Sequence, residues 1–287
     1  MSGQKYLIIH MDDIGINDGA NEAARHLFEI GTVTSASVII PGRAAHEFVR
    51  WWCCHPVYDV GIHSAVTCEW DNLRWGTVCD KKEVPSVIDG DGFMVKGSKQ
   101  ETGNISAIDY TKETIAQIKK ACEWGLVPTH LDNHMWTVSA SNDMLAAYLG
   151  IARQYKLVPH IPGWNNFNET RANIVKISNF KQVDYDYTIP NQNEEKYEFK
   201  KEFLLKLLGS LSPGLSVLTI HPSVRTEEAM HMVRDCKNRV EEYRLFLERE
   251  VAEALKENDI VLTDWKQAGE KQAGERKKAE SVSTERN

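Results

Sequence analysis

The chain has 287 residues, of which 42% are hydrophobic and 26% charged, a composition typical of a globular protein with a sizeable core. Its formal net charge of −7 argues against a general nucleic-acid-binding protein, whose surface is basic, so we expect no nucleic-acid partner. The sequence lacks a run of about 20 apolar residues, the length that spans a bilayer, and the apolar stretch at residues 6–9 is too short for a secretory signal. We therefore expect a cytoplasmic protein without membrane contacts.

Strand and helix signals alternate through the first hundred residues. An apolar run without helical period predicts a buried first strand, and β-branched residues predict the second. The predicted elements are a strand at 5–10, a helix at 18–30 ending at Gly31, a strand at 33–40, a helix at 44–53 and a strand at 59–66. Residues 67–104 then form a long irregular stretch, and loops of that length inside a compact domain are often functional.

The alternation continues through the second half of the chain. The predicted elements are a helix at 110–124, a strand at 129–134, a helix at 142–155, short strands near 158–161 and 183–187, a helix at 194–208 stopped by Gly209, a strand at 215–220, one long helix at 235–256 and a strand at 260–263. Such alternation predicts an α/β fold with a parallel sheet and right-handed crossovers. This length favours a distorted (β/α) barrel with about seven or eight mostly parallel strands, and a doubly wound open sheet is the alternative.

The end of the sequence differs from the rest in composition. Residues 266–270 (Lys-Gln-Ala-Gly-Glu) are repeated at 271–275, and the remainder is polar and charged without apolar anchors. We therefore predict one barrel domain over residues 1–265 and a mobile tail over residues 266–287.

Polar residues end four of the predicted strands, where a (β/α) barrel places its catalytic groups. These residues are Asp12 and Asp13 after the first strand, His63 in the third, His130, Asp132 and His134 in the strand after Pro128, and His221 in the late strand. Two imidazoles and a carboxylate are typical ligands of Zn²⁺ or another first-row divalent ion. Four strand ends with such residues therefore predict a metal centre.

The adjacent pair Asp12 and Asp13 offers two roles at one strand end. Successive side chains of a strand point to opposite faces, but a bend into the Gly15 loop would let both reach one site. One carboxylate could then bind the ion while its neighbour accepts a proton from water. The alternative for such a pair is a helix cap or a solvated loop.

His130 and His134 have the spacing of a metal-binding pair on a helix, but they lie in a predicted strand. Four residues of a strand span about 13 Å, so the two imidazoles cannot bind one ion. His134 lies nearest the active end of the barrel. We expect His130 and Asp132 to support the ligands or the structure without binding the ion.

Aromatic residues lie close in sequence to these polar groups. Trp70, Trp75 and Trp136 could stack on sugar rings, and Arg74 and Asn133 could bind hydroxyl groups. The alternative is that the tryptophans belong to the hydrophobic core.

These motifs resemble those of the YdjC-like carbohydrate deacetylases, a family that includes chitooligosaccharide deacetylase. The matching segments, in similar order and spacing, are His10-Met-Asp-Asp-Ile-Gly15, Gly61-Ile-His63 with Thr67 four positions on, Pro128-Thr-His-Leu-Asp-Asn-His134 and His221-Pro222. They extend over residues 5–263, and the third segment is the most specific.

The resemblance implies a distorted barrel with one divalent metal ion, Mg²⁺ or Zn²⁺, bound by Asp13, His63 and His134. It makes Asp12 the general base, and similarity to the wider polysaccharide deacetylases makes His221 the general acid. The implied reaction removes an N-acetyl group from an amino sugar or short oligosaccharide by metal-activated water, so the expected partner is a small carbohydrate. The resemblance also suggests a homodimer.

The sequence departs from the family around the expected substrate pocket. Many relatives carry further histidines after the position of His134, where this chain reads Met135-Trp136-Thr137. The ligands are present, but the chitooligosaccharide substrate does not transfer with them. Two alternatives stay open, a metal-dependent phosphoesterase or glycosidase that pairs Asp12 with Asp132 or Glu69, and a sugar-sensing barrel without catalysis.

Overall fold

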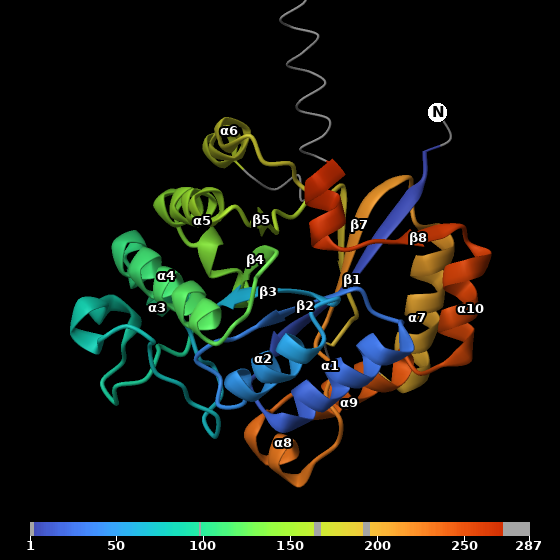
Figure 1. Ribbon diagram of the computed structural model, residues 1–287, viewed down its shortest axis with the longest axis horizontal. Helices are drawn as coiled ribbons and strands as arrows, with labels where there is room; N and C mark the ends of the chain where they lie inside the picture. Colours follow the sequence, from blue (N-terminus) through green and yellow to red (C-terminus); the bar gives the residue numbers. More distant parts are fainter. Residues whose placement is uncertain (1–2, 98, 164–167, 192–195, 272–287) are drawn as a thin grey trace, which may run out of the picture.

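The computed structural model describes residues 3–97, 99–163, 168–191 and 196–271. In this part of the chain, eight strands pair in parallel and curl into a distorted barrel with helices on its outside (Figure 1). The strands are β1 (Lys5–Ile14), β2 (Ser35–Val38), β3 (Asp59–Ser64), β4 (His130–Asn133), β5 (Val158–Pro159), β6 (Tyr185–Thr188), β7 (Gly214–Ile220) and β8 (Ile260–Leu262). The predicted fold class is confirmed.

The spatial order of the strands is β5-β4-β3-β2-β1-β7-β6. β7 pairs with β1 over residues 5–11, so β2 and β8 share the other edge of β1. β8 takes the start of that edge and β2 takes its end. The two outer strands, β5 and β6, are joined near their ends, where the backbone N–H of Val183 donates to the carbonyl of Ile161.

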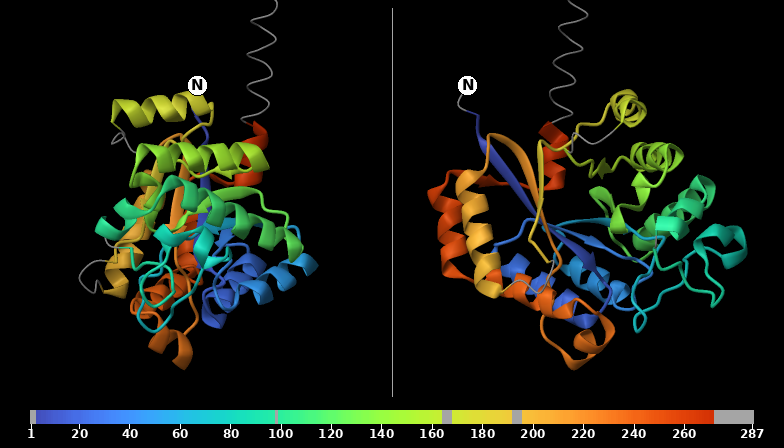
Figure 2. Two further views of the ribbon diagram at one scale, coloured as in Figure 1. Left: turned by 90° about the vertical axis from the view of Figure 1, so that its left-hand side faces the viewer. Right: turned by 180° about the vertical axis from the view of Figure 1, so that it is seen from behind.

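Helices cover the outside of the sheet, as two further views show (Figure 2). They are α1 (Asp18–Ile30), α2 (Ala45–Cys54), α3 (Lys99–Asn104), α4 (Ala107–Glu123), α5 (Asn142–Tyr155), α6 (Glu169–Ser178), α7 (Tyr197–Ser210), α8 (Glu227–Met232), α9 (Cys236–Leu245) and α10 (Arg249–Glu257). α5 packs between α4 and α6, and α10 packs against α7. No helix among the residues described above is long and apolar enough to cross a membrane.

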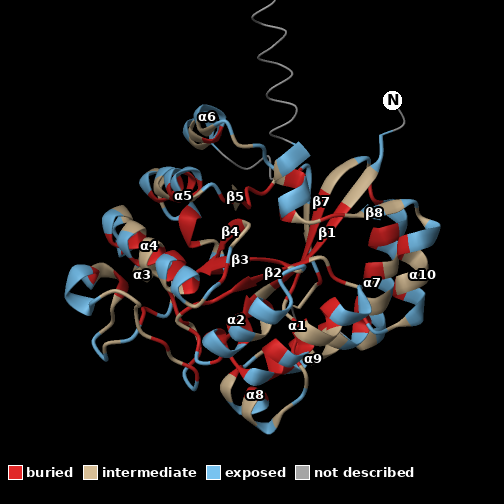
Figure 3. Cartoon of the chain, in the orientation of Figure 1, coloured by how far each residue is buried: buried red, intermediate tan, exposed pale blue. Residues whose placement is uncertain are grey.

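The side chains of β1 alternate between two environments. Leu7, Ile9 and Met11 belong to the large apolar core, whereas Ile8 belongs to a small separate cluster with Trp265. His10 follows on the same face as Ile8, because successive strand residues alternate. The strands at the centre are buried along their length, while the helices expose their outer faces (Figure 3). The inner face of β1 thus changes from apolar to polar toward its carboxyl end.

Some of the predicted helix boundaries are wrong. The long helix expected at 235–256 is two helices, α9 and α10, because Glu248 has extended backbone at the start of α10. The break lets α10 pack on α7, while Arg239 and Glu242 of α9 reach the carboxyl ends of β1 and β7. Gly209 does not stop α7, which continues to Ser210. α3, α6 and α8 lie in segments for which no helix was predicted.

The end of the described chain closes the base of the barrel. Residues 265–271 are helical, and Trp265 and Ala268 are buried against Ile8. The backbone N–H of Trp265 donates to the Asp59 carboxylate at 3.2 Å. The domain boundary expected at residue 266 therefore falls inside a packed helix, and the remainder of the predicted tail lies outside the described residues.

Candidate active site

The carboxyl end of β1 carries both aspartates of the site. The pairing of β1 with β2 shifts register between Met11 and Ile14, where three steps along β1 face two along β2. Within this bulge, Asp13 has a left-handed backbone with φ of 62°. Such a bulge re-aims the side chains of a strand, so Asp12 and Asp13 approach one site although they are neighbours. The bulge thus brings Asp12 Oδ2 to 3.9 Å and Asp13 Oδ1 to 3.3 Å from His63 Nε2.

Asp13, His63 and His134 converge on one point. Asp13 Oδ1 lies 3.3 Å from His63 Nε2 and 3.1 Å from His134 Nδ1. One ligand atom of each residue lies within 4.8 Å of the others, an arrangement that could hold a metal ion. Asp13 Oδ1 is buried without a hydrogen-bond partner in the described chain, so its lone pairs remain available. All three side chains are at most 3% exposed.

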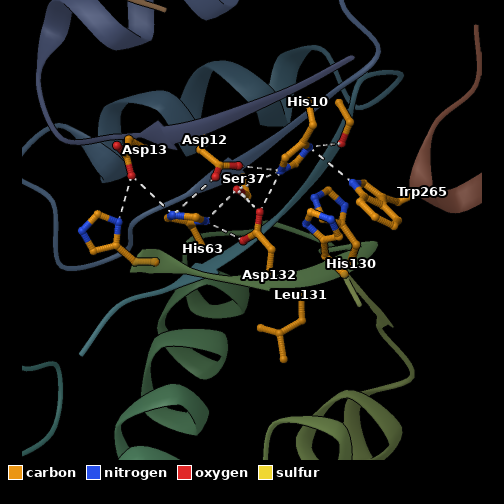
Figure 4. A network of polar contacts seen from close by, with 12 residues as sticks. His10, Asp12, Asp13, Ser37, His63, His130, Leu131, Asp132 and Trp265 are labelled. Atoms are coloured by element: carbon orange, nitrogen blue, oxygen red, sulfur yellow. Dashed lines mark hydrogen bonds and ion pairs between the residues drawn. The ribbon is translucent and has the colours of Figure 1, made fainter. Parts of the chain in front are cut away.

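Each of these three residues has a charged partner on the side that faces away from the shared point. Asp13 Oδ2 accepts a hydrogen bond from Arg239 at 2.7 Å. His63 Nδ1 lies 2.7 Å from Asp132 Oδ1, and the network of these groups is seen in Figure 4. His134 Nε2 lies 2.8 Å from Glu69 Oε2. Such partners fix the orientation of metal-binding side chains and raise the basicity of imidazoles.

Asp132 is the centre of a buried polar network beneath the site (Figure 4). Its Oδ2 accepts a hydrogen bond from Ser37 at 2.7 Å and lies 2.7 Å from His10 Nε2. The same His10 nitrogen lies 3.1 Å from Asp12 Oδ1. Asp132 therefore orients the candidate ligand His63, and His10 joins Asp132 to Asp12.

Neighbouring charges shift the pKa values of the three converging side chains. Burial alone would raise the pKa of Asp13, but Arg239 and His134 hold it well below its usual range. Burial alone would lower the pKa of His134, but the carboxylates of Glu69 and Asp13 raise it to about 9. The pKa of His63 is likewise raised, because the carboxylates of Asp132 and Asp12 outweigh its burial. These directions favour an ionised Asp13 and protonated imidazoles while no ion is bound, so a cation at this point would take the place of the imidazole protons.

Asp12 and His221 lie at the solvent side of this centre. Their side chains are 17% and 29% exposed, and Asp12 Oδ2 lies 3.9 Å from His221 Nε2. Asp12 Oδ2 is also 3.9 Å from His63 Nε2. The backbone N–H of His221 donates to the buried carboxylate of Glu242 at 2.5 Å. A carboxylate and an imidazole therefore flank the candidate metal ligands where a substrate can reach them.

His130 lies deeper in the barrel, as expected, and does not contact the shared point. Its ring stacks on Trp265 at 5.6 Å and meets the ring of His10 edge-on at 5.1 Å. The indole nitrogen of Trp265 lies 3.3 Å from His10 Nδ1 (Figure 4). Burial keeps the pKa of His130 well below its usual value, so this imidazole is neutral. His130 is thus part of the floor beneath the site.

The residues expected to bind substrate do not form one surface. Trp70 and Trp75 are each 4% exposed and pack around His134, so they enclose this imidazole and offer little open surface to a sugar. Arg74 bonds to the Asp89 carboxylate and the carbonyl of Met94 inside its own loop. The burial of Trp70 and Trp75 favours the alternative that they belong to the core, and the contacts of Arg74 leave it engaged within its own loop. Trp136 is half-buried against His160, and its role in substrate binding stays a prediction.

Four functional neighbours were not predicted from the sequence, namely His10, Glu69 as a partner of His134, Arg239 and Glu242. The alternation of β1 could have found His10, because it lies two residues before Asp12 on the same face. Arg239 and Glu242 are one turn apart on α9. No local sequence pattern indicates that residues of this distant helix contact the ends of β1 and β7.

The family model described as YdjC-like protein matches residues 6–257. The chain belongs to this family. Curated YdjC relatives include the carbohydrate deacetylase of Thermoanaerobacter pseudethanolicus, 25% identical with 91% of this chain and 98% of the relative covered. The carbohydrate deacetylase of Thermus thermophilus is 27% identical, with 90% and 92% covered.

A solved structure has the same fold as this YdjC-like chain. It is a putative cellobiose-phosphate cleavage protein from Enterococcus faecalis, with a TM-score of 0.79 and 20% identity. The match covers 92% of this chain and 99% of that protein. The distorted barrel is therefore shared along the whole length of the domain.

Proposed function

We propose that the protein is a metal-dependent carbohydrate deacetylase that removes an N-acetyl group from an amino sugar or a short oligosaccharide. The observation that carries the proposal is the convergence of Asp13 Oδ1, His63 Nε2 and His134 Nδ1, with Asp12 and His221 beside them. Three protein ligands beside an acid–base pair are the arrangement of a hydrolytic metal site. The curated relatives match this chain over nearly their full length and are named carbohydrate deacetylases, which supports the same activity.

The donor set fits a divalent ion. Two neutral imidazoles and one carboxylate oxygen are typical of Zn²⁺ and other first-row ions, whereas Mg²⁺ prefers oxygen ligands. Oδ1 of Asp13 lies 3.1–3.3 Å from both imidazoles and is not held by any other group in the described chain, so the three donor atoms can share one cation. Between the expected Mg²⁺ and Zn²⁺, the residues therefore favour Zn²⁺.

A bound ion would polarise the amide carbonyl and make water more acidic. Asp12 accepts the proton of the attacking water, since its Oδ2 faces the site and its Oδ1 is held near His10. His221 donates a proton to the departing amine as the carbon–nitrogen bond breaks. Glu242 fixes the backbone of His221 at the end of β7. The products are acetate and a free amino sugar.

The glycosidase alternative is disfavoured by the state of its carboxylates. Asp132 is buried, and both of its oxygens are engaged with His63, His10 and Ser37. Glu69 Oε2 is engaged with His134. Neither is free to face Asp12 across a sugar ring, as a glycosidase pair requires.

Acetate release tests the proposal. The purified protein is incubated with N-acetylglucosamine and its short oligomers, with and without added Zn²⁺, Mg²⁺, Mn²⁺ and Co²⁺. We expect acetate release that a chelator abolishes and one of these ions restores. Asp12→Asn should lose at least about 100-fold in kcat while it still binds the ion, whereas Asp91→Asn in the exposed loop serves as the matched control. Near-normal activity of Asp12→Asn would refute the assignment of the base.

A further inference from the structure

A buried arginine on α9 touches the candidate metal centre from outside the predicted motifs. We propose that Arg239 is a positioning residue of this centre, which holds Asp13 so that a single carboxylate oxygen, Oδ1, faces the ion. The inference rests on the metal site of the proposed function and adds a residue to it.

The two oxygens of Asp13 have different environments. Oδ2 accepts a hydrogen bond from Arg239 Nη2 at 2.7 Å, while Oδ1 has no hydrogen-bond partner and lies 3.1–3.3 Å from the two imidazoles. A charge-assisted hydrogen bond of this length is strong and directional. With Oδ2 held by the guanidinium, the carboxylate cannot rotate to present both oxygens to an ion.

Arg239 is itself fixed on three sides. Its Nε donates to Asp235 Oδ2 at 3.0 Å, one turn earlier on the helix. Its guanidinium lies over the ring of Trp70 at 5.2 Å, and the indole N–H of Trp70 donates to Asp235 Oδ1 at 3.3 Å. Its backbone carbonyl accepts the N–H of Ser223, just after His221-Pro222. The side chain is 5% exposed and therefore has little freedom to leave Asp13.

The conformation of Asp13 explains why such an anchor is needed. Its left-handed backbone is uncommon for a residue with a side chain and persists only where the surroundings determine it. Arginine suits this role because it stays charged and its planar fork can hold two carboxylates at once, here Asp13 and Asp235. Lysine would keep the charge but lose the second contact.

The test measures metal affinity and coordination rather than turnover. Zn²⁺ affinity is determined by competition with a chromophoric chelator, and the absorption spectrum of the Co²⁺-loaded protein reports the ligand geometry. We expect Arg239→Met to weaken Zn²⁺ binding about 10–100-fold and to change the Co²⁺ spectrum, as the loss of a hydrogen bond to a metal ligand does elsewhere. Arg239→Lys should recover part of the affinity because it keeps one donor.

Lys200 provides the matched control. Lys200 is a fully buried cation on α7. It bonds to Asn238 and Glu241 of α9, the helix that also carries Arg239. Lys200→Met should lower the unfolding temperature without changing Zn²⁺ affinity. If Zn²⁺ affinity falls in the Arg239 variants but not in Lys200→Met, the loss is due to the position of Asp13 and not to general destabilisation.

Two results would overturn the inference without being confused with failure of the proposed function. A folded Arg239→Met that binds Zn²⁺ as tightly as the wild type, with an unchanged Co²⁺ spectrum, shows that Arg239 does not position Asp13. If that variant does not fold, unchanged affinity and spectrum in Arg239→Lys decide against the inference in the same way. A wild-type protein that binds neither ion instead contradicts the proposed metal site itself.

Discussion

Gly61 on β3 has no side chain, and this leaves room for the His130 ring at the floor of the site. A Cβ atom at this position would lie 2.4 Å from Cδ2 and 2.6 Å from Cε1 of the His130 ring. The ring cannot retreat, because it packs between His10 and Trp265. Gly61 therefore lets β3 and β4 pair closely while His130 fills the interior two residues below Asp132.

Gly61→Ala should destabilise the fold by about 1–3 kcal/mol through this overpacking. The effect should shrink when His130 is also replaced by alanine, because the clashing ring is then gone. Urea unfolding of both single variants and the double variant gives the coupling energy of the pair. Additive effects within about 0.5 kcal/mol would show that the ring and the glycine do not constrain each other.

Asp132 should govern metal affinity although it does not face the ion. Asp132→Asn removes the negative charge that orients His63, so we expect Zn²⁺ binding to weaken by about 10–100-fold. Asp109→Asn is the matched control. Asp109 is also buried, but its carboxylate accepts a hydrogen bond from the backbone N–H of Ser86 and does not contact His63. Equal Zn²⁺ affinities of the two variants, measured by chelator competition, would contradict the role given to Asp132.

The sequence was informative about ligands and less so about their partners. Asp13, His63 and His134 were candidates because each lies at or next to a strand end, where the strands of a parallel barrel meet, and the resemblance to the YdjC-like family singled them out. Glu69 and Arg239 were not, because their contacts depend on how a long loop and a distant helix pack. For Trp70 and Trp75 the sequence left sugar stacking and core packing open, since sequence alone does not separate a buried tryptophan from an exposed one.

At the scale of elements, the boundaries of strands were better predicted than those of late helices. Apolar and β-branched runs located β1, β3 and β7 within a few residues, because burial on both faces leaves a continuous apolar signal. The periodic pattern across residues 235–256 continued through the break between α9 and α10 and concealed it. That break turns α9 toward Asp13 and His221, so the missed boundary lies at a functional element.

The helix at 265–271 should be required for stability, whereas the residues after it should not. Trp265→Ala removes a buried indole from beneath His10 and His130, at an expected cost of about 3–5 kcal/mol in the free energy of unfolding. A chain shortened to end at Lys271 should unfold at the wild-type temperature and keep its activity. Thermal unfolding of both proteins checks this, and a large loss of stability in the shortened chain would place the missing residues in the fold.

Across the whole molecule, the candidate ligands come from strands that are not all neighbours. Asp13 belongs to β1, His63 to β3, and His134 follows β4, while β2 lies between β1 and β3. β2 points the small side chains of Ser35 and Ser37 at His10, which leaves room for larger groups from both sides to meet. The barrel curvature, and not any single motif, brings three strand ends to one point.

An ion at that point should therefore link distant parts of the sheet and stabilise the whole domain. Binding to the folded state alone adds about 2.7 kcal/mol to the free energy of unfolding when free Zn²⁺ is 100 times its Kd. We expect Zn²⁺ to raise the unfolding temperature of the wild type. Asp13→Asn, which keeps the shape of the side chain but loses its charge, should show little or no rise. The decisive comparison is the shift between chelator-treated and Zn²⁺-loaded samples of each protein. An equal shift in both would mean that the ion stabilises the barrel from some other place than the point where Asp13, His63 and His134 meet.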